Sequence, residues 1–156
     1  MAWPGLKPTS IFSIYLETGG KITPLNLQIL SDTGKQILED GKPFAAGGDW
    51  QIEGQQLLDL GWVDLIHGMV RAGDSKMGTC TVASPPTNIE YFVMHTALSH
   101  MVPEAEIDLD SRLAPHRPVR SFLQLRGGEQ NPCAMRGQDA GASGTCLETA
   151  RAAIVL

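Results

Sequence analysis

Large apolar residues are most concentrated between Pro85 and Pro103, where the chain reads PPTNIEYFVMHTALSHMVP. From Ile89 to Met101 an apolar residue recurs at every fourth position, which would give a helix one apolar face. Thr87 and Glu90 have the spacing of a helix-capping pair, so we predict a helix that begins at Thr87 and ends before the second proline. The alternation of apolar residues before His95 also permits a buried strand that ends there, and this alternative stays open.

The first part of the chain predicts strands. Residues 11–16 (IFSIYL) form a mostly apolar run that is typical of a buried strand. Over residues 25–29 leucine and isoleucine alternate with polar residues, so this strand would bury one face only. SDTG at 31–34 is rich in turn-forming residues, and residues 35–39 would return as the partner strand before the Asp40-Gly41 turn. We therefore predict a β-hairpin over this segment.

Residues 43–70 have weaker patterns. PFAAGGDWQIEG at 43–54 is rich in glycine and small residues and predicts a surface loop with aromatic anchors. LLDLGWVDLIHGMV at 57–70 has apolar residues at helical spacing, but its two glycines would each cost a helix about 1 kcal/mol relative to Ala. We predict a strand there, and residues 62–70 would pair with the β-branched residues 79–83 in a second hairpin.

Acidic residues alternate with apolar ones from Glu104 to Asp110, which would place four carboxylates on one face of an extended strand. Their oxygens suit calcium, but the spacing and the glycine of a calcium-binding loop are absent, so we predict a solvated strand face. Residues 119–126 alternate again and predict another strand. Thr145 and Glu148 repeat the capping spacing and predict a short C-terminal helix, with a strand over the last four residues as the alternative.

These patterns predict a mainly β fold, an antiparallel sandwich or barrel with one or two α-helices, and an α+β fold is the alternative. Two prolines and a glycine predict an extended N-terminal arm over residues 1–10. Residues 11–126 would form a single β-rich domain, since one core is usual at this size. Residues 127–156 would form a Gly-rich extension and a short C-terminal element.

Composition excludes several classes of partner. Charged residues make up 19% of the 156 residues and the formal net charge is −5, so no basic surface is available for nucleic acid. No apolar run approaches the roughly 20 residues that span a bilayer, which predicts no membrane partner. Prolines near the N-terminus replace the apolar segment of a secretion signal, so we expect the chain not to be exported by that route.

The three cysteines, Cys80, Cys133 and Cys146, are expected to be reduced, because a chain of this length needs no disulfide staple. A bridge between Cys133 and Cys146 is the alternative. No pair has the CxxC spacing of a zinc or redox site.

The histidines do not form a metal-binding motif by themselves. His95 and His100 are five residues apart, a spacing that turns their side chains about 140° apart on a helix. A metal site would need distant residues to join one of them, such as His67, His116 or the acidic residues of 104–110.

Known catalytic loops are also missing. GQDAGASGT at 137–145 could bind an anion ahead of a helix, but it lacks the lysine of a phosphate-binding loop. No GxSxG motif is present, and no cofactor is predicted. A thiol, an imidazole and an acid could still converge, and the candidate site for that chemistry is His67, Cys80 and His95.

Few charges and missing catalytic motifs favour a structural assembly subunit of a larger particle, of the viral or phage capsid, decoration or tail type. Its partners would be other copies of itself or other particle subunits, and its setting would be the virion, by analogy. Trp3 in the arm and Met135 in the Gly-rich segment are the candidate interface residues, although Trp3 could instead pack on its own domain. The alternative is a small cytoplasmic hydrolase, metal- or thiol-dependent, or a ligand-binding domain that uses His67, Cys80 and His95.

Overall fold

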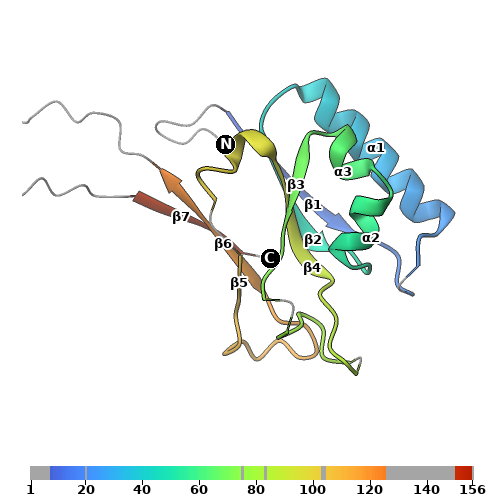
Figure 1. The fold of residues 1–156 in the computed structure, drawn as a ribbon, viewed down its shortest axis with the longest axis vertical. Coiled ribbons are helices and arrows are strands. Elements are labelled where there is room, and N and C mark those ends of the chain that lie inside the picture. The colour runs from blue at the N-terminus through green and yellow to red at the C-terminus, as the bar shows by residue number, and fades with distance from the viewer. Residues whose placement is uncertain are drawn as a thin grey trace, which may run out of the picture.

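A four-stranded sheet forms the centre of the fold, with helices on one face and a three-stranded sheet on the other (Figure 1). The structure is a computed structural model that describes residues 8–19, 21–74, 76–82, 84–102, 105–125 and 150–155. The strand order is β1-β2-β4-β3 in the larger sheet and β5-β6-β7 in the smaller one. The elements are β1 (Ser10–Tyr15), α1 (Pro24–Asp40), β2 (Phe44–Asp49), α2 (Gly54–Asp59), α3 (Trp62–Leu65), β3 (Gly68–Arg71), β4 (Glu90–His95), the 3-10 helix η1 (Thr96–Leu98), β5 (Glu106–Ile107), β6 (Val119–Leu125) and β7 (Ala150–Val155).

The described residues form an α+β fold, so the α+β alternative is confirmed and the mainly β class is corrected. Strands β1 and β2 are parallel and are joined through helix α1, a connection that an antiparallel sandwich or barrel does not contain. The remaining pairs of the larger sheet, β2 with β4 and β4 with β3, are antiparallel. Strand β1 confirms the strand that was predicted over residues 11–16.

Helix α1 occupies the segment for which a hairpin was predicted, so that prediction is wrong. The Thr23 hydroxyl accepts a hydrogen bond from the Asn26 amide (3.1 Å), and Pro24 follows in the first turn, where its missing N–H matters least. Gly41 ends the helix in the left-handed conformation with φ of 58°. The alternation over residues 25–29 does not reflect a buried strand face, because Leu25 and Leu27 are about half exposed, at 52% and 49%.

The buried face of α1 contains residues that did not look apolar. Asn26 is fully buried because its Oδ1 accepts from the Glu17 amide (2.7 Å) and its Nδ2 donates to the Lys21 carbonyl (3.2 Å). Gly34 lies within the helix against α3, where an added Cβ would come within 2.9 Å of Trp62 Nε1. The helical period was therefore hidden by an amide and a glycine.

Strand β2 replaces the predicted surface loop at 43–54. It lies between β1 and β4, and its small residues reflect close packing rather than mobility, since an added Cβ at Gly48 would lie 1.7 Å from the Ile14 carbonyl oxygen. The predicted strand over 57–70 is also wrong for most of its length. Gly61, with φ of 70°, separates α2 from α3, and only β3 is extended. Strand β3 pairs with β4 and not with residues 79–83.

The helix predicted from Thr87 to Met101 is wrong, and the strand alternative that ends at His95 is confirmed as β4. Strand β4 pairs on both edges and is covered on both faces, so four consecutive residues, Tyr91 to Met94, are fully buried. A strand in this position carries a continuous apolar run in which alternation is lost. Thr87 pairs with Cys80 and caps no helix.

The smaller sheet revises the C-terminal predictions. Only Glu106 and Ile107 of the acidic segment form a strand, β5, whereas Asp108 and Asp110 lie in the following turn and Glu104 is outside the described residues. The predicted four-carboxylate strand face is therefore wrong. Strand β6 confirms the strand predicted over 119–126, and β7 replaces the C-terminal helix by the strand alternative. Strand β7 pairs with β6.

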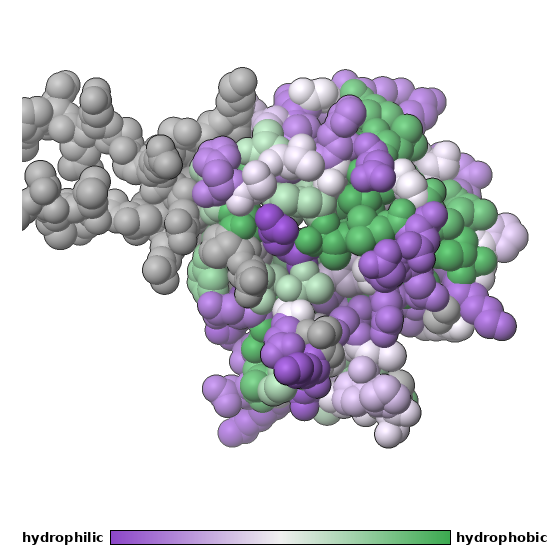
Figure 2. Space-filling view, in the orientation of Figure 1, coloured by the Kyte–Doolittle hydropathy of each residue, from purple (hydrophilic) through white to green (hydrophobic). Residues whose placement is uncertain are grey.

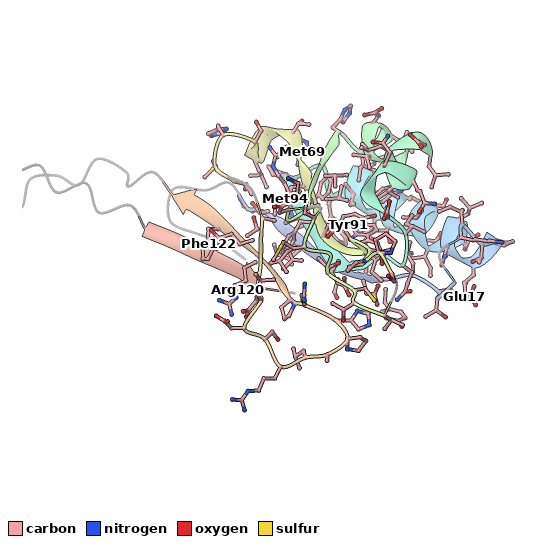
Figure 3. All side chains as sticks on the ribbon, turned by 60° about the horizontal axis from the view of Figure 1, so that its bottom comes forward. Glu17, Met69, Tyr91, Met94, Arg120 and Phe122 are labelled. Atoms are coloured by element: carbon pink, nitrogen blue, oxygen red, sulfur yellow. The ribbon has the colours of Figure 1, made fainter. Side chains whose placement is uncertain are left out.

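The two faces of the larger sheet pack against different layers. On the helical face Leu30, Trp62 and Tyr91 belong to one buried cluster; on the other face Phe92, Met94 and Val119 belong to a second. Hydrophobic surface also remains over the helices (Figure 2). Figure 3 shows Tyr91 and Met94 inside the body, with Arg120 and Phe122 on β6 beyond them. In the part of the chain that the structure describes, no helix combines the length and apolar character needed to cross a membrane.

Candidate functional site

Two carboxylates face each other at one end of the larger sheet. Asp49 ends β2 and Glu90 begins β4, and the two residues are direct partners in the antiparallel register. Cross-strand partners project to the same face of a sheet. Alternation along β4 puts Glu90 on the face of Phe92 and Met94, away from the helices. Both carboxylates therefore lie on the face that the second sheet partly covers.

Thr79 fixes the start of β4 from a separate segment. Its hydroxyl accepts hydrogen bonds from the amides of Ile89 and Glu90, both at 3.0 Å, and its side chain is fully buried. Two amides that would otherwise be unpaired at the end of the strand are satisfied in this way. These two hydrogen bonds to Thr79 hold the backbone at the start of β4, and no other acidic residue takes part in them.

His116 reaches the carboxylates because its backbone is held against residues 79–81. The Thr81 amide donates to the Pro115 carbonyl (3.1 Å), and the Arg117 amide donates to the Thr79 carbonyl (2.7 Å). Between these bonds His116 lies opposite Cys80. The His116 side chain then turns toward β4, and its Nδ1 is in hydrogen-bond contact with Glu90 Oε1.

Asp49 is oriented by the turn that follows its strand. The Gln51 amide donates to Asp49 Oδ1 (3.2 Å), and Gln51 Nε2 donates to Asp49 Oδ2 (2.5 Å). Gln51 adopts a positive φ of 55°, which directs both donors back to the carboxylate. Trp50, which lies between Asp49 and Gln51, is fully buried. Its indole N–H donates to the Tyr91 carbonyl (2.9 Å), which holds the ends of β2 and β4 together.

The three side chains form one cluster in which a ligand atom from each lies within 4.8 Å of the other two. Glu90 is only 6% exposed, and its Oε2 has no hydrogen-bond partner among the described residues. Like charges directly opposite one another on adjacent strands destabilise a sheet. A buried carboxylate oxygen without a partner, next to a second carboxylate, favours a positively charged occupant.

The cluster opens into a pocket of about 290 Å³. This volume is at the small end of the range found for ligand sites. The pocket lies between the first two strands of the larger sheet and the segment before β6, and it is lined by Ser13, Gly48, Asp49, Glu90, Leu113, His116, Arg117 and Pro118. Gly48 contributes only backbone atoms to this wall.

The residues of the predicted site, His67, Cys80 and His95, do not converge. His67 and His95 are neighbours at the far end of β4, with ring centroids 6.5 Å apart, and His95 Nδ1 accepts a hydrogen bond from the Ala97 amide (3.0 Å). Cys80 lies near the opposite end, beside Thr87 and His116. Strand β4 separates the two ends by about 17 Å, at roughly 3.3 Å for each residue step.

Sequence reasoning named His116 only as a residue that could complete a distant metal site, and it considered Glu90 only as a helix cap. The sequence pattern assigns no role to Asp49, because this residue lies in the segment predicted as a surface loop. No spacing motif connects positions 49, 90 and 116. The available signal was an acidic residue at one end of each of two buried runs, since Asp49 follows FAAGG and Glu90 precedes YFVM. The interface candidates Trp3 and Met135, and the cysteines Cys133 and Cys146, lie outside the described residues.

Comparisons of the chain with protein families, with curated proteins and with solved structures give no match. Function must therefore be inferred from the chemistry of the site.

Proposed function

We propose that this protein binds one divalent first-row transition metal ion, Zn²⁺ or Mn²⁺, through Asp49, Glu90 and His116. The observation that carries the proposal is the buried Glu90 carboxylate, whose Oε2 has no partner among the described residues although a second carboxylate and an imidazole adjoin it. A metal ion would neutralise both carboxylates and accept the lone pairs of all three side chains.

The spacing of the three ligand atoms is compatible with this occupant. Ligands bound at about 2.1 Å in a tetrahedral arrangement lie about 3.4 Å apart. The cluster, whose ligand atoms lie within 4.8 Å of one another, needs side-chain movements of about 1.4 Å or less to reach this arrangement. His116 has room for such a movement because its side chain is 43% exposed.

The donor set favours particular metals. Two carboxylates alone would suit Mg²⁺ or Ca²⁺, whereas an imidazole ligand favours Zn²⁺ and its first-row neighbours. Three protein ligands leave at least one coordination position for water or for a ligand oxygen, as in catalytic zinc sites. The pocket adjoins that position, so the proposed activity is metal-dependent binding or hydrolysis of a small molecule.

Metal binding must displace the hydrogen-bonded proton between His116 and Glu90, since Nδ1 and Oε1 cannot hold a proton and an ion with the same lone pairs. A neutral His116 would carry this proton on Nε2 instead, which leaves the Nδ1 lone pair free for the ion.

Calorimetric titration with Zn²⁺ and with Mn²⁺ tests the proposal directly. We expect one ion per chain, and Asp49→Asn, Glu90→Gln and His116→Ala should each weaken binding by at least about tenfold. The double variant His67→Ala/His95→Ala is the matched control. It removes two neighbouring imidazoles that lie outside the proposed site, so it should leave the affinity unchanged. Failure of both metals to bind, or loss of binding in the control alone, would refute the proposal.

Assembly into a larger particle stays a second, separate prediction. One observation favours it. The edge strand β1 exposes two large side chains on one face, Ile11 at 51% and Tyr15 at 65%. Sedimentation velocity at micromolar concentration tests it, and a single monomeric species would contradict it.

A further inference from the structure

Helices α1 and α3 enclose an apolar groove of about 420 Å³, which we call the α1–α3 groove. It is lined by Ser31, Gly34, Lys35, Leu38, Glu39, Trp62 and Leu65. The floor exists because Gly34 has no side chain, which lets the Trp62 indole lie against α1 and donate to the Leu30 carbonyl (2.7 Å).

The rim of this groove exposes large apolar side chains to water. Leu38 is 48% exposed and Leu65 is 61% exposed, although both flank the buried Trp62. Hydrophobic surface gathers over the helical side of the molecule, where this groove lies (Figure 2). The rim charges Lys35 and Glu39 form an ion pair with each other (3.9 Å), which leaves the centre of the groove apolar.

The first described residues, from Pro8 onward, lie close to one end of the groove. Pro8 lines a hollow together with Asp40 and Lys42, at the C-terminal end of α1. The Ser10 hydroxyl donates to Asp40 Oδ2 (3.0 Å), which holds the start of β1 against the helix end. Leu38 is two residues, or about 3 Å of helix rise, from this point.

We propose that Trp3, carried by residues 1–7, occupies the α1–α3 groove of its own chain. Trp3 precedes Pro8 by five residues, and five extended residues span about 18 Å. The groove extends along α1 from Ser31 to Glu39, about 12 Å, and its nearer end is beside Asp40. Each proline fixes its own φ, so Pro4 and Pro8 would reduce the entropy lost on docking.

The groove and the arm are complementary in chemistry. An indole buries more apolar area than any other side chain, and edge-to-face contact with a second aromatic ring is favourable. Trp62 provides such a ring at the floor, and the two rim leucines provide aliphatic contact. A tethered arm binds its own groove at an effective concentration in the millimolar range, which favours the same chain over a neighbouring copy.

Acrylamide quenching of tryptophan fluorescence tests the proposal. Trp50 and Trp62 are buried, so quenchable emission in the folded protein reports Trp3, the remaining tryptophan of the three. We expect little quenching in the wild-type protein and strong quenching after Leu38→Ser or Leu65→Ser. Leu25→Ser is the matched control, because Leu25 is exposed on α1 but does not line the groove, and it should leave Trp3 protected.

Two further measurements separate the possible occupants. Trp3→Ala should lower the melting temperature by several degrees while light scattering shows a monomer before and after the substitution. A wild-type dimer that Trp3→Ala converts to a monomer would overturn the proposal in favour of arm exchange between copies. Quenching of Trp3 in the wild-type protein, or protection that survives both leucine substitutions, would overturn it as well.

Discussion

Replacing Glu90 by Gln is expected to stabilise the metal-free protein and to abolish its response to metal. Glu90 is 6% exposed, it lies opposite Asp49, and its Oε2 has no partner among the described residues. Glutamine keeps the shape of the side chain and a carbonyl oxygen that can accept from His116. Its amide group takes the place of Oε2 and can donate to the Asp49 carboxylate.

The magnitude follows from three effects. Removal of the like-charge pair between cross-strand neighbours gains about 0.2–1 kcal/mol. Pairing of a buried polar position that was unsatisfied gains about 1–3 kcal/mol. Replacing the carboxylate acceptor of His116 by a neutral carbonyl costs up to about 1 kcal/mol, because the His116 side chain is 43% exposed and water screens the interaction. The net expectation is a gain of about 1 kcal/mol, or about 2–4 °C in melting temperature.

Differential scanning calorimetry in chelator and in excess metal measures both parts. At about 100 times its Kd, a metal ion should stabilise the wild-type protein by about 2.7 kcal/mol and leave the variant unchanged, so the order of the two melting temperatures should reverse. Asp74→Asn, at an exposed aspartate outside the cluster, is the control and should change neither value. A Glu90→Gln protein that is less stable than the wild type in chelator would refute the view that this unpartnered carboxylate destabilises the metal-free fold.

Further outcomes are expected at other positions. Thr79→Val should lower the unfolding free energy by at least about 2 kcal/mol and weaken metal binding, because two amides at the start of β4 lose their acceptor; urea unfolding and calorimetric titration measure the two effects. Burial raises the pKa of Tyr91 above its ordinary value near 10, so the unfolded chain releases that proton first and stability should fall as the pH rises above about 10. Tyr91→Phe should reduce this alkaline loss in urea unfolding at pH 7 and pH 10.5, and an identical loss in both proteins would contradict the assignment. Cys80, buried and unpaired, should react slowly with a thiol reagent while Cys133 reacts readily, and mass spectrometry of the labelled peptides would reveal the opposite order.

The local pattern of apolar and polar residues predicted a strand correctly where the strand's burial in the fold agrees with its own composition. Strands β1 and β6 were predicted at nearly their observed bounds, because each is a short apolar or alternating segment with clear turn residues at its ends. The central strands were not, because β2 consists of small residues and β4 is apolar without a break. Both features result from burial on two faces, a property of the sheet and not of the strand.

Helix α1 was predicted wrongly although the signals for its two ends are present in the sequence. Its start and end signals, Thr23-Pro24 and Asp40-Gly41, were present in the sequence, but its buried face includes Asn26 and Gly34, which carry no apolar signal. Only the contacts of Asn26 with the preceding loop, and of Gly34 with Trp62, explain why those residues are inside.

The sequence by itself determined the low content of charged residues, and its local patterns predicted the strands at residues 11–16 and 119–126. It also contained every ligand of the candidate metal site. Only the tertiary structure decided that Asp49, Glu90 and His116 meet, because strand register joins the first two and a short backbone pairing beside Cys80 delivers the third. Those pairings depend on hydrogen bonds between backbones, which are the same for nearly every residue type and therefore leave no mark in the spacing of side chains.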